Sequence, residues 1–146
     1  MIIYNGTKES FTSSVKDQQL VGMLNDAVYE KMHRRTGKSE LESWKNSMMY
    51  MYMALDDVAI PNDAGIAIEY NIPQTSKRVD FIISGYDEDK KDSVIIVELK
   101  QWSELNAVEG VEALVETYTG GGLRRVVHPS YQAWSYSALI KDYNDT

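Results

Sequence analysis

The chain has 146 residues, of which 43% are hydrophobic and 25% charged, the composition of a globular protein that can bury a sizeable core. The absence of cysteine excludes disulfides, thiolate catalysis and thiolate zinc sites, and it fits a reducing cytoplasm. The net charge of -7 disfavours passive binding of nucleic acid through clustered cations. We expect one cytoplasmic domain, residues 1–146, without a membrane span, because no apolar run approaches the thickness of a bilayer.

Two helices are predicted in the first part of the chain. Apolar residues recur at the helical period within residues 17–35, which predicts an amphipathic helix that ends near Gly37. Ser39, followed three residues later by Glu42, has the form of a capping box. It predicts a second helix that begins there and reaches about Leu55.

Strands are predicted next. Residues 1–4 form either a short strand or an N-terminal arm, and residues 66–72 and 77–84 have strand character. Residues 92–101 contain four consecutive β-branched residues, a pattern typical of a strand covered on both faces. The short links between the last three segments predict a meander in which residues 92–101 form the central strand.

The last part of the chain is less regular. Residues 111–119 fit either a helix or a strand, and three glycines at residues 120–122 interrupt whichever forms. His128, Pro129 and Ser130 are predicted to open a final helix that runs through about Tyr143, with Pro129 in its first turn. The fold class expected from these elements is α/β, with a central mixed β-sheet flanked by α-helices.

Two charges stand at the end of the predicted central strand. Side chains alternate along a strand, so Glu98 and Lys100 point to the same side. An unpaired charge in an apolar setting costs several kcal/mol, so each must have a partner. Asp80 on the preceding strand is expected beside Glu98, and two such carboxylates suit Mg²⁺ or Mn²⁺. Lys100 would then orient the attacking water or stabilise charge on a phosphate.

This order of residues resembles the PD-(D/E)XK nuclease superfamily. Asp80 and the Glu98-x-Lys100 motif lie on consecutive strands, and Gln132 and Tyr136 on the final helix resemble the Gln-x-x-x-Tyr motif of the RecB-like branch. The resemblance implies a restriction-endonuclease-like core. It also implies a Mg²⁺-dependent or Mn²⁺-dependent nuclease in which these five residues are catalytic and Asp80 and Glu98 hold the metal.

A closer resemblance covers nearly the whole chain. It is similar to the N-terminal nuclease-like domain of a bacterial family of uncharacterised proteins, in which a Schlafen-like P-loop ATPase/helicase follows. Four strings carry it: residues 43–47, 76–80, 98–103 and 128–136. The resemblance implies such an ATPase/helicase as a partner, fused or separate, because no Gly-x-x-x-x-Gly-Lys-Ser/Thr occurs in this sequence.

Two features depart from the superfamily pattern. Val79 stands before Asp80 where the motif has proline. The sequence also stops at Thr146, so the last strand of the superfamily core is expected to be missing.

Structural readings compete with these roles. Asp80, Glu98 and Lys100 would alternatively form an ion-pair network. Gln132 and Tyr136 would alternatively belong to ordinary helix packing, since a tyrosine usually buries its ring and needs one partner for its hydroxyl.

Two further acidic residues are candidates. Glu40 is the expected third metal ligand, on the same side of its helix as Trp44, and the alternative is that it only favours the helix N-terminus. Glu69 on the first strand is a further candidate, with a cross-strand partnership to Lys77 or Arg78 as its alternative.

Scattered basic residues are candidates for nucleic-acid phosphates. They are Lys77, Arg78, Arg124 and Arg125, with solvated surface as the alternative. His128 beside Pro129 is interpreted as a helix-entry residue and not as a catalytic base.

The sequence therefore predicts a metal-dependent nuclease acting on nucleic acid, DNA or RNA. The alternative is a catalytically inactive, nuclease-derived module that binds nucleic acid or a partner. A third reading is a structural domain that regulates an associated P-loop ATPase/helicase.

Overall fold

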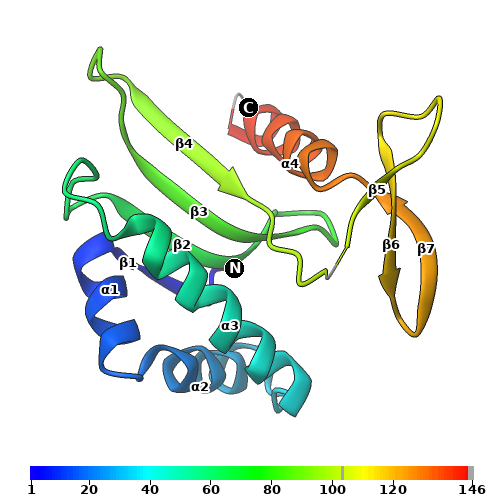
Figure 1. Cartoon of the computed structure of the whole chain (residues 1–146). Coiled ribbons are helices and arrows are strands. Elements are labelled where there is room, and N and C mark those ends of the chain that lie inside the picture. Colours follow the sequence, from blue (N-terminus) through cyan, green and yellow to red (C-terminus); the bar gives the residue numbers. More distant parts are fainter. Residues whose placement is uncertain (103, 145–146) are drawn as a thin grey trace. The chain divides into compact units, whose positions relative to one another are not determined.

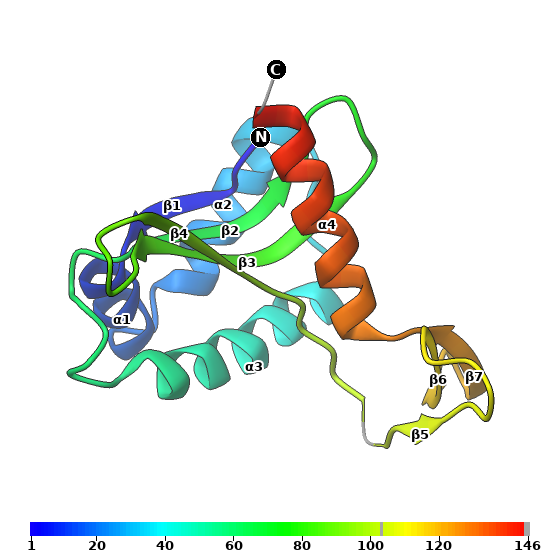
Figure 2. The ribbon, with the colours of Figure 1, turned by 90° about the horizontal axis from the view of Figure 1, so that it is seen from above.

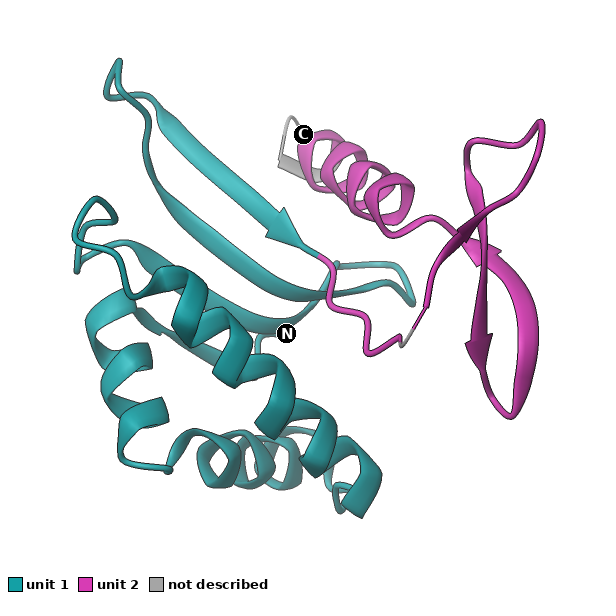
Figure 3. Ribbon diagram, viewed as in Figure 1, with its two compact units in different colours: residues 1–97 teal, residues 98–146 magenta. Residues whose placement is uncertain are grey.

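The computed structural model describes residues 1–102 and 104–144, and it divides the chain into two compact units. Unit 1 is Met1–Val97 and unit 2 is Glu98–Thr146 (Figure 3). Ser103, the last residue of one string that carries the family resemblance, lies outside the described residues. The prediction of a single domain stays a prediction.

Unit 1 is a four-stranded antiparallel sheet with three helices on one of its faces (Figures 1 and 2). The strand order is β1-β2-β3-β4. The elements in chain order are β1 (Tyr4–Thr7), α1 (Lys8–Lys16), α2 (Leu20–Met32), α3 (Lys38–Leu55), β2 (Gly65–Asn71), β3 (Arg78–Tyr86) and β4 (Asp92–Val97). The three predicted strands within residues 66–101 are confirmed as β2, β3 and β4, but β4 ends at Val97, so Glu98 and Lys100 lie beyond the strand on which they were expected. The N-terminal strand β1 begins at Tyr4, the last residue of the predicted segment.

The predicted position of β4 is wrong. It pairs only with β3 in this sheet, so it is an edge strand and not the central one. Val94 and Ile95 are 57% and 56% exposed, although the run of β-branched residues predicted cover on both faces. Such a run shows a preference for extended backbone but does not fix how many neighbours the strand has. The described strands also pair only antiparallel, so the prediction of a mixed sheet is wrong as well.

The first predicted helix, over residues 17–35, is confirmed as α2, which is shorter and runs from Leu20 to Met32. Its C-cap is His33, whose φ of 51° is left-handed, so the helix ends before Gly37 is reached. The sequence did not predict α1, which ends at Lys16. Gln18, with a φ of 58°, lies between α1 and α2 and separates the two helices.

The capping box predicted at Ser39 is wrong, although the helix itself is confirmed. The N-cap of α3 is Gly37, and its cap makes no side-chain hydrogen bond. A capping box instead begins α1, where Thr7 accepts from the backbone N–H of Ser10 and the Ser10 side chain accepts from the Thr7 backbone N–H. The sequence signature failed because this box uses serine where glutamate or glutamine is usual.

Aromatic rings and one buried lysine hold the helices against the sheet. Phe11 of α1 meets Phe81 of β3 edge-on, with ring centroids 5.4 Å apart, and both side chains are fully buried. Lys8 is also buried, and its ammonium donates to the carbonyl oxygens of Asp57 and Ile60 at 2.6 and 2.7 Å. These two bonds satisfy a charge that would otherwise be costly to bury.

Unit 2 consists of a small antiparallel sheet and one helix. Its elements are β5 (Asn106–Ala107), β6 (Leu114–Thr119), β7 (Gly122–Val127) and α4 (Pro129–Asn144). The ambiguous segment is therefore strand, and Gly120 and Gly121, with φ of 59° and 87°, make the turn between β6 and β7. The prediction of a final helix with Pro129 in its first turn is confirmed.

The chain is thus an α/β protein with two antiparallel sheets and four helices within the described residues. None of these helices is both long enough and apolar enough to cross a membrane, as far as residues 1–102 and 104–144 are concerned.

Candidate functional site

Four of the five predicted catalytic residues gather around one carboxylate in unit 2. The side-chain amide nitrogen of Gln132 donates to Glu98 Oε1 at 2.9 Å and to the hydroxyl oxygen of Tyr136 at 2.9 Å. The ammonium of Lys100 lies 3.9 Å from Glu98 Oε2, close enough for an ion pair but too far for a hydrogen bond. We refer to Glu98, Lys100, Gln132 and Tyr136 as the Glu98 cluster.

Within the Glu98 cluster, the side chain of Glu98 and the residue Tyr136 are nearly closed to solvent, and the side chain of Lys100 is partly exposed. The side chain of Glu98 is 2% exposed and that of Lys100 is 28% exposed. Tyr136 is 8% exposed. A buried carboxylate with a charge-assisted donor and a nearby ammonium is held in one orientation.

The spacing of the Gln-x-x-x-Tyr motif explains why its two side chains meet. Residues four apart on a helix lie on the same face, and Gln132 and Tyr136 are both in α4. The aromatic neighbours Tyr131 and Trp134 pack on each other, with ring centroids 5.6 Å apart, and are 49% and 65% exposed. The side-chain amide of Gln132 therefore bonds both to the Glu98 carboxylate and to the Tyr136 hydroxyl. The catalytic role of Gln132 and Tyr136 stays a prediction.

Asp80, the fifth predicted catalytic residue, belongs to unit 1. It lies on β3 between Val79 and Phe81, both fully buried, and is itself half-buried. On the neighbouring strand β2, Ile68 pairs with Phe81 and Tyr70 pairs with Val79. The register therefore sets Asp80 level with Glu69.

Glu69 is a buried carboxylate on β2, 6% exposed, with partners on two other elements. Trp44 Nε1 of α3 donates to Glu69 Oε1 at 3.1 Å. Arg78 Nε of β3 lies 2.6 Å from Glu69 Oε2, an ion pair whose angle is not that of a linear hydrogen bond. The expected partnership of Glu69 with Arg78 is thus confirmed.

Burial raises the pKa of the Glu69 carboxyl above its ordinary value. Arg78 and Trp44 act in the opposite direction because they stabilise the ionised form. The negative charges of Asp80 and Glu40 add to the rise. The carboxylate of Glu69 therefore feels the charge of Asp80, which places the two acidic groups in one electrostatic environment.

Glu40, the expected third metal ligand, is engaged elsewhere. Its two oxygens accept from the two Nη atoms of Arg34 at 3.1 and 3.2 Å, a bidentate pair. This bond raises the pKa of the Arg34 guanidinium. Glu69, and not Glu40, is the acidic residue that the register of β2 and β3 sets level with Asp80.

The predicted nucleic-acid contacts are divided between the units. Lys77 is exposed just before β3, and Arg78 at its start pairs with Glu69 as described. Arg124 and Arg125 are exposed on β7. Arg124 donates to the carbonyl oxygen of Gly120 at 3.1 Å. Two of the four predicted residues therefore belong to unit 1 and two to unit 2.

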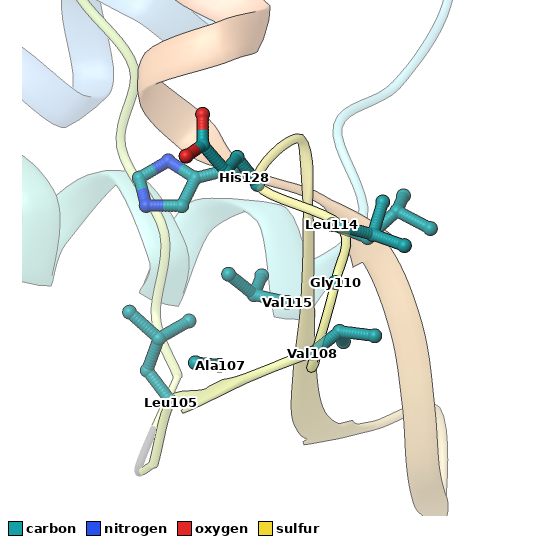
Figure 4. Close-up of a pocket in the computed structure, with 9 residues that line it drawn as sticks. Leu105, Ala107, Val108, Gly110, Leu114, Val115 and His128 are labelled. Atoms are coloured by element: carbon teal, nitrogen blue, oxygen red, sulfur yellow. The ribbon is translucent and has the colours of Figure 1, made fainter.

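His128 and a hollow of unit 2 that it borders lie outside the Glu98 cluster. His128 Nδ1 accepts from the backbone N–H of Ser130 at 3.0 Å, which confirms it as a helix-entry residue. His128 also borders a hollow of about 580 Å³ lined mainly by apolar side chains such as Leu105 and Val115 (Figure 4). None of the predicted catalytic residues lines this hollow.

Metal-ligand candidates are few. In the described parts of the chain, no three or more His, Cys, Asp or Glu side chains are grouped so as to hold a metal ion. Comparison with family models, curated proteins and solved structures gave no significant match for this chain.

Proposed function

We propose that the chain is a Mg²⁺-dependent or Mn²⁺-dependent nuclease that hydrolyses phosphodiester bonds of nucleic acid. The observation that carries the proposal is the hydrogen bond between Gln132 and Glu98, which are 34 residues apart. Each residue belongs to a different nuclease-like motif, and the two motifs meet at one buried carboxylate.

The residues present fit a hard divalent cation. Mg²⁺ needs only one or two protein carboxylates, since waters fill its other positions. We propose Asp80 and Glu98 as those carboxylates. Such a cation, when bound, neutralises phosphate charge and makes a nearby water more acidic.

The other residues of the Glu98 cluster have separate roles in this proposal. Lys100 provides a positive charge that orients the attacking water and stabilises charge developing on the phosphate. Gln132 fixes the orientation of the Glu98 carboxylate, and Tyr136 fixes the amide of Gln132. Arg34 engages both oxygens of Glu40, so Glu40 is a weaker candidate for the third metal ligand than the sequence alone indicated.

The wider expectations belong to the same proposal. The antiparallel strands β2, β3 and β4, with α3 preceding them, support a restriction-endonuclease-like core. We further propose a cytoplasmic location and a P-loop ATPase/helicase as partner, fused or separate.

Metal titration tests the proposal before any substrate is known. Calorimetry of Mn²⁺ into the whole chain is expected to show binding at millimolar concentrations or below, and Asp80→Asn and Glu98→Gln are each expected to abolish it. The matched control is Glu88→Gln, an exposed acidic residue in the turn after β3. Equal Mn²⁺ binding by wild type and both site variants would refute the metal site.

A second candidate function is a nuclease-derived module that binds without cutting. The net charge of -7 is the observation that favours it. Retained binding of labelled DNA or RNA together with no binding of Mn²⁺ would select this module over the nuclease.

A further inference from the structure

Glu69 combines two features that each carry a cost for a strand residue, a left-handed backbone and a buried carboxylate. Its backbone φ of 57° is in the left-handed region, which is strained for a residue other than glycine. Ile68 and Glu69 are consecutive buried residues, so the alternation of buried and partly exposed residues along β2 is interrupted at this point. Burial also disfavours the ionised form of the side chain. A feature with these costs calls for a reason other than stability.

Glu69 connects a buried tryptophan, Trp44, to the guanidinium of Arg78. Trp44, 5% exposed, fixes Oε1, and Oε2 faces the Nε side of the Arg78 guanidinium at 2.6 Å. The Arg78 side chain is still 41% exposed. A guanidinium has four N–H donors on its two Nη atoms, in a planar fork that matches two oxygens of a phosphate.

The position of this arginine relates it to the proposed metal ligand. Arg78 and Asp80 are two residues apart on β3, so they point to the same face of the strand, and the intervening Val79 is fully buried on the other. We propose that Trp44 and Glu69 position Arg78 to bind a phosphate of a nucleic-acid substrate next to Asp80. This inference rests on the proposed function and assigns Glu69 and Trp44 as positioning residues.

The competing explanation is that Glu69 only neutralises Arg78. The two explanations predict opposite signs for Glu69→Gln. Removing a negative charge from an acidic protein strengthens binding of nucleic acid if charge alone matters. If Glu69 only neutralises Arg78, the substitution also makes the Arg78 charge available to a phosphate. If Glu69 positions Arg78, the same substitution weakens binding, because the mobile guanidinium must be ordered again on the phosphate.

The experiment is a double-mutant cycle on nucleic-acid affinity. The probes are fluorescein-labelled 20-mers of single-stranded and double-stranded DNA and RNA, and anisotropy is measured in EDTA and in Ca²⁺, so that binding is read without turnover. Arg78→Ala is expected to weaken binding about tenfold, the effect of one charge-assisted contact, and to reduce the salt slope by about one. Glu69→Gln is expected to weaken binding about threefold to tenfold and to have no further effect in the Arg78→Ala background.

Two controls separate positioning from general effects. Arg35→Ala removes one exposed arginine of unit 1 and is expected to leave the affinity within about twofold. Thermal unfolding of Glu69→Gln is expected to match or exceed that of wild type, so weaker binding cannot be attributed to misfolding.

The outcomes distinguish this inference from the proposed function. Unchanged or tighter binding by Glu69→Gln overturns the positioning role, whether or not the wild type cuts nucleic acid. Weaker binding that depends on Arg78, with no cleavage by wild type, supports the positioning role and refutes the nuclease. Failure of wild type to bind any of the probes at micromolar concentrations overturns the inference.

Discussion

The side-chain amide of Gln132 lies between two partners, donating at 2.9 Å both to the Glu98 carboxylate and to the Tyr136 hydroxyl. A glutamine amide has two N–H donors, so both bonds form at the same time. Gln132 is therefore the residue through which α4 is connected to the Glu-x-Lys motif. The predictions below start from that connection.

Gln132→Ala is expected to lower the rate of nucleic-acid cleavage by about ten- to a hundredfold. The substitution removes one hydrogen bond to a charged group, which is worth about 1.5–3 kcal/mol, and the Glu98 carboxylate loses its fixed orientation. The measurement is a single-turnover cleavage assay in Mn²⁺. Ser135→Ala is the matched control on α4, because the Ser135 hydroxyl bonds only to a carbonyl of its own helix in the described structure. Equal rates for Gln132→Ala and the control would contradict the role of Gln132.

Tyr136→Phe is expected to have a smaller effect that depends on Gln132. It removes the hydroxyl but leaves the ring in its buried position, so the Gln132 amide loses one of its two partners. We expect a loss of about three- to tenfold in the rate, and no further loss when Tyr136→Phe is added to Gln132→Ala. The same cleavage assay on the double variant checks this. Additive losses would mean that Tyr136 acts independently of Gln132.

Thr7→Ala is expected to destabilise unit 1 by about 1 kcal/mol, the usual effect of losing an N-cap side chain. Thr7 caps α1 in a reciprocal pair with Ser10. Ser39→Ala is the contrasting variant: Ser39 has the sequence signature of a cap but lies inside α3, so its loss is expected to change stability by less than about 0.5 kcal/mol. Urea unfolding compares the two. A larger loss for Ser39→Ala than for Thr7→Ala would contradict the assigned caps.

The raised pKa of Glu69 predicts a pH-dependent stability with a definite sign. An acid whose pKa is higher in the folded protein binds its proton more tightly there, so its contribution to stability is present below the unfolded value, about 4.3, and is lost as the pH rises through the folded pKa. Glu69→Gln keeps an acceptor for Trp44 and cannot ionise. Its stability relative to wild type is therefore expected to increase from pH 4 upwards.

Urea unfolding of both proteins between pH 4 and pH 8 measures this difference, with Glu88→Gln as the exposed control. A difference between wild type and Glu69→Gln that shrinks with rising pH would show that Arg78 and Trp44 outweigh the burial of Glu69.

The sequence predicted best what depends on local spacing. The spacing of four residues from Gln132 to Tyr136 sets both on one helix face. Glu98 and Lys100 do lie within ion-pair distance, but they are beyond the end of β4 at Val97, so strand alternation is not the reason. The sequence predicted less well what depends on neighbours distant in the chain. The β-branched residues of β4 did not reveal that this strand lies at an edge, and the helix α1, which precedes the predicted helix, was missed. Glu69 was recognised as a partner of Arg78, but its burial and strained backbone become visible only when β2 and α3 are packed together.

The most direct test of the nuclease is cleavage of labelled DNA and RNA, single-stranded and double-stranded, by the whole chain in Mg²⁺ or Mn²⁺ and in EDTA. The wild type is expected to cut at least one of these substrates only when the metal is present. Asp80→Ala and Lys100→Ala are each expected to abolish cleavage, and Ser135→Ala is expected to retain it. Unchanged cleavage by both Asp80→Ala and Lys100→Ala would contradict the proposed site.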